Sequence, residues 1–145
     1  MIYTPLTKKA MLTAYRAHLN QFDKGGLPYI FHPYHLAEAM SDAISTAVAF
    51  LHDVAEDTEI TLEQLRQAGF PEEVLTPLKL LTKQPGEDYF DYILKLKSNA
   101  VARQVKIEDL RHNSDITRLD HSDEKTAKRL DKYKKALKIL TEAEK

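Results

Sequence analysis

Apolar residues recur at intervals of three and four positions through nearly the whole chain, and no segment alternates as a half-buried strand does. This periodicity is typical of amphipathic helices packed around a shared core. The predicted helices cover residues 5–24, 33–40, 46–56, 61–69, 71–81, 87–97, 100–115 and 123–143. Pro77 should interrupt or kink the fifth of them. The sequence therefore predicts an all-α fold of about seven or eight helices.

Length and composition favour one small enzyme-sized domain over residues 1–145. The 145 residues are 43% hydrophobic, which is enough for a sizeable core. A net charge of −1 argues against nucleic-acid binding, and the absence of cysteine excludes disulfides and thiol ligands. The start of the chain lacks a signal-peptide pattern, and no apolar run approaches the roughly 18 residues of a membrane span. We therefore expect a cytoplasmic protein without membrane contacts.

The run from Leu51 to Thr58 concentrates four ionisable side chains. If it is helical, His52, Asp53, Glu56 and Asp57 fall within an arc of roughly 140°. Three carboxylates on one face repel one another, and the apolar residues 47–51 that lead into them argue against a solvated surface. A bound cation would remove this repulsion.

Two further ligands can be found elsewhere in the chain. His32 follows a turn-rich segment, and Asp109 lies in a polar stretch of a predicted helix. With His52 and Asp53 they supply two imidazoles and two carboxylates, a set that suits Mn, Fe, Co, Ni or Zn. Water bound to such a cation is a ready nucleophile.

Glu56 and Asp57 are the candidate catalytic residues, because either carboxylate could orient the attacking water or move its proton. They could instead favour helix termination and bond to a neighbouring backbone.

The order His, then His-Asp, then Asp resembles the HD-domain metal-dependent phosphohydrolases. More narrowly, residues 28–33, 52–58 and 106–113 resemble the hydrolase domain of the RelA/SpoT alarmone enzymes and their small single-domain relatives. The resemblance spans about residues 8–133. It implies an HD-domain fold, Mn²⁺ as cofactor and release of pyrophosphate from the 3′ position of guanosine tetraphosphate or pentaphosphate. The chain is too short for the synthetase and regulatory domains of the long enzymes.

Substrate contacts are predicted from spacing and from the resemblance. Asn113 lies one helical turn after Asp109 and could bond to a ribose or phosphate oxygen. Lys24 and Lys83 are candidate partners for substrate phosphates, as are Arg111 and Arg118. Arg129 and Tyr133 stand one turn apart at positions where the resemblance places substrate contacts. The other basic residues of the last helix should form a solvated face.

Asp23 departs from the family pattern, because the long hydrolases carry an arginine there that packs against guanine. We therefore expect weak discrimination between guanine and adenine, and tighter binding in Asp23→Arg. Another phosphorylated nucleotide, such as a dinucleotide with a 2′-phosphate, is the alternative substrate. Two other hypotheses about function remain, a non-catalytic nucleotide sensor and a purely structural helical module. Three other histidines, His18, His35 and His121, are expected to be packing or exposed residues.

Overall fold

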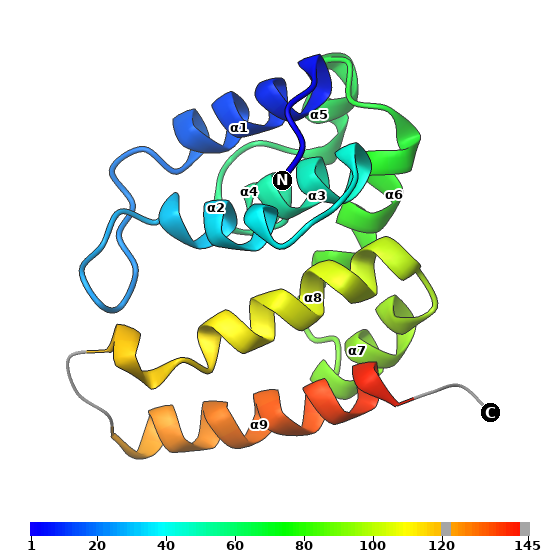
Figure 1. Ribbon diagram of the computed structural model, residues 1–145. Coiled ribbons are helices and arrows are strands. Elements are labelled where there is room, and N and C mark those ends of the chain that lie inside the picture. Colours follow the sequence, from blue (N-terminus) through cyan, green and yellow to red (C-terminus); the bar gives the residue numbers. More distant parts are fainter. Residues whose placement is uncertain (120–122, 143–145) are drawn as a thin grey trace.

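The structure, a computed structural model, describes residues 1–119 and 123–142 and confirms the all-α prediction (Figure 1). These residues form nine α-helices, one 3₁₀ helix and no strand beyond an isolated bridge. The helices are α1 (Pro5–Ala17), α2 (Phe31–Glu38), α3 (Ala43–Leu51), α4 (Val54–Asp57), α5 (Leu62–Gln67), α6 (Glu72–Leu81), α7 (Tyr89–Lys97), α8 (Ala100–Asn113), the 3₁₀ helix η1 (Ile116–Arg118) and α9 (Glu124–Thr141).

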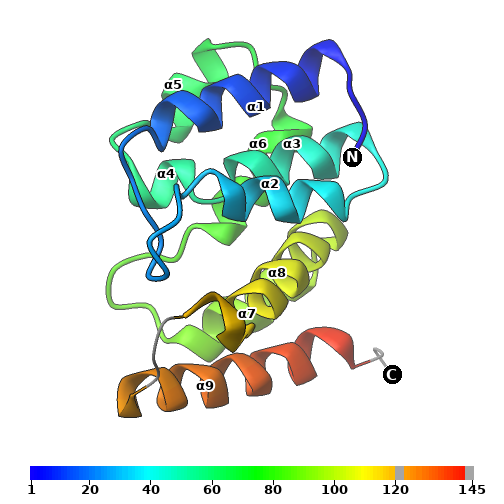
Figure 2. The same ribbon diagram turned by 60° about the vertical axis from the view of Figure 1, so that its left-hand side comes forward.

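Helix α3 is the centre of the fold. Every residue from Ser45 to Leu51 is buried, and α3 packs against α1, α2, α6 and α8. Figures 1 and 2 show α1 on one side of α3, α8 on the other, and α9 on the outer side of α8. A helix that is apolar all round must be covered on every side. The end of α3 therefore meets residues from several other helices.

The predicted helix over 46–56 is wrong at its start and in its continuity. Asp42 caps α3 by accepting a hydrogen bond from the Ser45 amide at 2.8 Å, so the helix begins earlier. It ends at Leu51, and α4 begins at Val54. His52 Nδ1 donates to the Ala49 carbonyl, 2.7 Å away. That carbonyl is the acceptor that a continuing helix would pair with the Asp53 amide.

The predicted end of the first helix is also wrong. Helix α1 ends at Ala17 and not near residue 24, because Asn20 adopts a left-handed φ of 70°. The segment 18–30 is instead a loop in which Phe22 and Pro28 form a bridge. Pro77 does not interrupt α6, which is one helix on both sides of it.

The remaining boundaries lie close to the prediction. The predicted capping box is present, since Thr61 and Gln64 exchange side-chain and backbone hydrogen bonds at the start of α5. Helix α9 is described to Thr141, and the predicted end at Ala143 lies outside the described residues. Among the described residues no helix is both long and apolar enough to cross a membrane.

Candidate metal centre and substrate cavity

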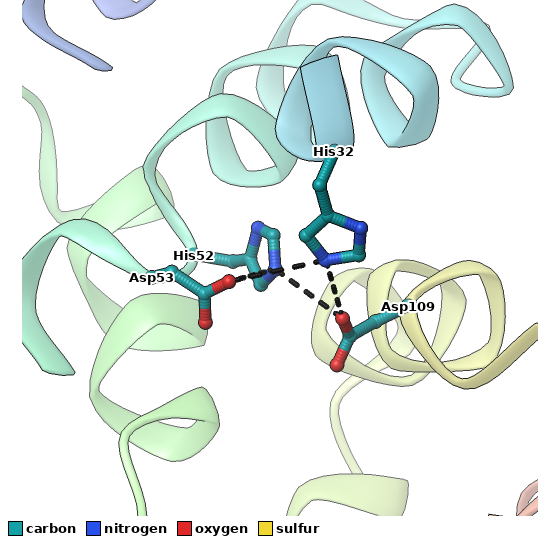
Figure 3. A group of neighbouring side chains, drawn as sticks. All are labelled: His32, His52, Asp53 and Asp109. Carbon is teal, nitrogen blue, oxygen red and sulfur yellow. Dashed lines mark hydrogen bonds and ion pairs between the residues drawn. The ribbon is translucent and has the colours of Figure 1, made fainter. Parts of the chain in front are cut away.

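Four side chains predicted to bind metal converge at one point (Figure 3). His32 comes from the first turn of α2, His52 and Asp53 from the α3–α4 junction, and Asp109 from α8. Each offers one ligand atom, and these four atoms lie within 4.8 Å of one another. His32, His52 and Asp109 are buried, so the cluster is part of the interior and not a chance group of surface charges. The two nitrogens and two oxygens suit a divalent cation of the first transition row.

The orientation of His52 supports a cation at this point. Its Nδ1 donates to the Ala49 carbonyl, so in the neutral ring Nε2 carries a lone pair. This Nε2 is buried, makes no hydrogen bond, and lies 2.9 Å from Asp53 Oδ2 and 3.5 Å from Asp109 Oδ1. A lone pair directed at two carboxylate oxygens needs a positive charge between them, which either a proton on Nε2 or a metal ion can supply. The donor set therefore fits a bound metal ion.

The pKa shifts of His52 and Asp53 also indicate that the cluster favours a positive charge. Burial disfavours the charged form of His52, but the Asp53 and Asp109 carboxylates outweigh it and hold the pKa of His52 well above its ordinary value. Burial likewise opposes ionisation of Asp53, yet the neighbouring imidazole lowers the pKa of Asp53 to about 2. Two ionised carboxylates therefore face the imidazoles, which is the arrangement that favours cation binding.

Three outer contacts hold the aspartates in place. Lys106 Nζ lies 2.9 Å from Asp109 Oδ2, and Asn113 Nδ2 donates to Asp109 Oδ1 at 3.0 Å. The Tyr29 hydroxyl donates to Asp53 Oδ2. Tyr29 and Lys106 were not predicted from the sequence, although both lie in the motifs that carry the family resemblance. The contact of Lys106 with Asp109 could have been predicted from spacing, because the two residues stand one helical turn apart.

A cavity of about 550 Å³ opens beside the four ligands. Of the predicted site residues, Glu56 and Asp57 line it from α4, and Lys24 lines it from the 18–30 loop. The predicted residues that line its other sides are Asn113, Arg129 and Tyr133.

Other predicted phosphate partners lie elsewhere or have another role. Lys83 is not among the described residues that line the cavity. Arg111 is exposed and pairs with Glu108 at 2.9 Å, and it does not line the cavity either. Arg118 does line it, in a salt bridge described below.

Glu56 and Asp57 differ electrostatically from the ligand aspartates. Partial desolvation and the Asp53 carboxylate raise the pKa of both side chains, while the Lys106 charge and a hydrogen bond from the Lys83 backbone oppose the rise at Glu56. A raised pKa makes a carboxylate a better proton acceptor. Neither residue belongs to the four-residue cluster, so both are placed to act on a molecule in the cavity.

Asp23 has a structural role that the sequence did not show. Its Oδ1 accepts hydrogen bonds from the amides of Gly25 and Leu27 at 2.9 and 3.0 Å. Its Oδ2 lies 3.3 Å from Arg118 Nη2, and both side chains line the cavity. A Cβ at Gly25 would lie 2.0 Å from the Arg118 carbonyl, so only glycine fits there. The loop is therefore locked against η1, and the cation at this wall comes from Arg118.

Of the three histidines that were expected to be packing or exposed residues, His18 and His35 lie as expected. His18 is buried with its Nδ1 bonded to Gln21, and His35 is exposed. His121 lies outside the described residues.

Comparison with known proteins gives relatives that are named either as pyrophosphohydrolases of guanosine-3′,5′-bis(diphosphate) or as GTP pyrophosphokinases. A Synechocystis protein named "Probable guanosine-3′,5′-bis(diphosphate) 3′-pyrophosphohydrolase" is 32% identical over 120 residues, which cover 72% of this chain and 16% of the relative. A guanosine-3′,5′-bis(diphosphate) 3′-pyrophosphohydrolase of Haemophilus influenzae is 35% identical over 111 residues, 67% of this chain and 16% of the relative. A GTP pyrophosphokinase of Myxococcus xanthus is 30% identical over 142 residues, 85% of this chain and 18% of the relative. The chain thus spans less than a fifth of these proteins. No protein-family model matches the sequence.

A solved structure shares the fold over almost the whole chain. It is described as a metazoan ortholog of SpoT that hydrolyzes ppGpp and plays a role in starvation responses. The TM-score is 0.75 at 18% identity, and the match covers 97% of this chain and 87% of the other. The predicted HD-domain fold is confirmed by this match. From the identity to these relatives, the shared fold and the cluster of two histidines and two aspartates, we conclude that the chain belongs to the RelA/SpoT-type HD-domain family.

Proposed function

We propose that this chain is a divalent-metal-dependent 3′-pyrophosphohydrolase of guanosine tetraphosphate and pentaphosphate. The observation that carries the proposal is the cluster of His32, His52, Asp53 and Asp109 at the edge of a 550 Å³ cavity lined by cationic and acidic side chains. The names of the relatives from Synechocystis and Haemophilus influenzae support this substrate.

The proposed cofactor is Mn²⁺, held by the two imidazoles and two carboxylates. Four protein ligands leave about two positions on a six-coordinate ion for oxygen ligands. When bound, such an ion lowers the pKa of water and polarises a phosphoryl oxygen. Tyr29, Lys106 and Asn113 keep the aspartates oriented through the contacts described above.

Proton handling is assigned to Glu56, with Asp57 as the alternative. Both carboxylates line the cavity beside the ligand cluster and have raised pKa values. In the proposal, one of them orients the attacking water and accepts its proton as the bond to the leaving ribose 3′-oxygen breaks. The products are pyrophosphate and a nucleotide with a free 3′-hydroxyl.

Substrate binding is assigned to the other walls of the cavity. Lys24 and Arg129 supply positive charge for the phosphates, since both side chains line the cavity from different elements. Tyr133 lies one turn after Arg129 on α9 and offers an aromatic face to the ribose or base. Asn113 lies between Asp109 and Arg118, bonded to both, and can reach a substrate oxygen beside the ligands. Lys83 has no part in the proposal.

The decisive experiment is a substrate panel with the Mn²⁺-loaded protein. We expect pyrophosphate and GDP from guanosine tetraphosphate, and loss of activity on chelation. Asp53→Asn, which weakens a ligand, should abolish turnover, whereas Arg111→Gln on the outer surface serves as the matched control.

A nucleotide with a 2′-phosphate, such as NADP, tests the alternative substrate in the same panel. The Asp23–Arg118 pair at the cavity wall is the feature that favours testing a different base, because the arginine there is already bound to a carboxylate. Turnover of NADP with intact guanosine tetraphosphate would refute the alarmone assignment and keep the metal hydrolase. Binding of nucleotides without any turnover would instead identify a sensor.

A further inference from the structure

The two histidines of the ligand cluster are oriented by different kinds of partner. His52 uses its Nδ1 to donate to the Ala49 carbonyl, which is a backbone group that no substitution removes. A ligating histidine needs such a second partner, because its other ring nitrogen must carry the proton and hold the ring plane. His32 should therefore have an equivalent partner at its own Nδ1.

The partner of His32 is the imidazole of His112. The two Nδ1 atoms lie 2.7 Å apart. The ring planes differ by only 7° while the ring centroids are 5.0 Å apart, so the rings lie edge to edge in nearly one plane. This is the geometry of a direct N–H···N hydrogen bond between imidazoles.

The direction of this bond follows from the other nitrogen of His32. Nε2 is the nitrogen that points into the cluster, 2.8 Å from Asp109 Oδ1. A ring that binds a cation through Nε2 carries its proton on Nδ1. His32 Nδ1 therefore donates, and His112 Nδ1 must accept with its own proton on Nε2.

His112 is itself held in the required plane. The exposed His35 ring stacks on it with centroids 4.0 Å apart and planes 17° apart. His35 stands one turn after His32 on α2, so one helix supplies both the ligand and the stacking ring. Arg118 Nη1 donates to the His112 carbonyl at 2.8 Å and fixes the backbone behind the ring.

We infer that His112 is a positioning residue for the metal centre, which accepts the His32 Nδ1 proton and so fixes both the tautomer and the ring plane of that ligand. The inference rests on the proposed metal site and adds to it a residue outside the four ligands. Outer partners of this kind typically contribute about 10–100-fold to metal affinity.

Mn²⁺ affinity, measured from the electron paramagnetic resonance of the free ion, tests the inference without any assay of turnover. His112→Phe keeps a planar ring for His35 but removes the acceptor, and we expect an affinity about 10–100-fold lower. His112→Gln restores an acceptor oxygen and should recover most of the loss. Arg111→Gln, the neighbouring exposed residue on α8, is the matched control and should bind as the wild type does.

A second measurement needs no variant. Ring-nitrogen NMR of the wild-type protein loaded with Zn²⁺ should show His32 protonated at Nδ1 and His112 protonated at Nε2. A proton on His112 Nδ1 would overturn the inference even if His112→Phe failed to fold.

The outcomes separate the inference from the proposed function. A wild-type protein that binds no divalent metal refutes the metal centre itself. A wild-type protein that binds Mn²⁺ while His112→Phe binds it equally well, with unchanged helical circular dichroism, refutes only the role of His112. Equal weakening in His112→Gln and His112→Phe would also contradict it, because the acceptor would then be irrelevant.

Discussion

At the scale of single residues, four carboxylates at the candidate site divide into two pairs with different surroundings. Asp53 and Asp109 face imidazoles, and their pKa values lie below the ordinary range. Glu56 and Asp57 face Asp53, and their pKa values are raised. Carboxylates whose environments push their pKa values apart are suited to different roles. Ligands and proton acceptors can therefore be told apart by substitution.

Glu56→Gln tests the proton acceptor. The amide keeps the size of the side chain but cannot take a proton, and we expect turnover to fall by about 10²–10⁴ with unchanged Mn²⁺ content. Steady-state kinetics and metal analysis of the purified variant measure both quantities. Glu59→Gln, on the same segment but outside the cavity wall, is the control. Near-normal turnover would assign the role to Asp57, and loss of metal would make Glu56 a ligand.

The sequence led us to expect that Asp23→Arg tightens nucleotide binding. The contacts of Asp23 in the structure lead to the opposite prediction. The arginine would remove the acceptor for two loop amides and place a second cation beside Arg118. Loss of these contacts should lower the free energy of unfolding by about 1–3 kcal/mol and weaken nucleotide binding. Asp23→Asn keeps the Oδ1 acceptor and should cost less. Urea unfolding of the two variants checks the order, and tighter nucleotide binding by a stable Asp23→Arg would contradict it.

At the scale of elements, α8 organises the site. It carries Asp109, the contacts of Lys106 and Asn113 to that ligand, and His112. Its start lies at the opposite end, where the Asn99 side chain accepts a hydrogen bond from the Ala102 amide at 2.9 Å. Stability and site geometry should therefore respond separately to changes at the two ends.

Asn99→Ala tests this separation. Loss of the cap should lower the free energy of unfolding by about 1 kcal/mol, because a helix amide loses its partner. Mn²⁺ affinity should stay the same, since the substitution lies more than two helical turns from Asp109. Chemical denaturation and a metal titration on one preparation give both values. Weaker metal binding with wild-type stability would show that the cap acts on the site.

Helix type and order could be predicted from the sequence, but helix ends at the site could not. Periodicity identified the helical segments because apolar spacing reports burial directly. The break after Leu51 depends on the His52 side chain competing for the Ala49 carbonyl, which periodicity does not report. The four ligands were predicted because their motifs are specific. Tyr29 contacts Asp53, and Arg118 pairs with Asp23, through the folding of distant segments, about which spacing carries little information.

At the scale of the whole molecule, the proposed metal joins three separate parts of the fold. Its ligands come from α2, the α3–α4 junction and α8, which all meet around the central helix. Binding to the folded state alone stabilises it by mass action. Metal binding and folding should therefore be coupled.

Metal removal should lower the melting temperature. At a metal concentration about 100-fold above Kd the expected stabilisation is about 2.7 kcal/mol. For a domain of this size that corresponds to a shift of roughly 5–10 °C. Differential scanning calorimetry with Mn²⁺ and with chelator measures the shift, and Asp109→Asn should abolish it. An unchanged melting temperature in protein shown to contain metal would contradict this coupling.

The two walls of the cavity belong to different parts of the chain. The four ligands lie on helices in or against the core, whereas the opposite side is made by the 18–30 loop, η1 and α9. Helix α3 packs mainly against α1, α2, α6 and α8, so we expect substitutions on that opposite side to disturb its packing little. A change of nucleotide preference would therefore need substitutions only on that opposite side, where Asp23 and Arg118 form their pair, and could leave the four proposed ligands as they are.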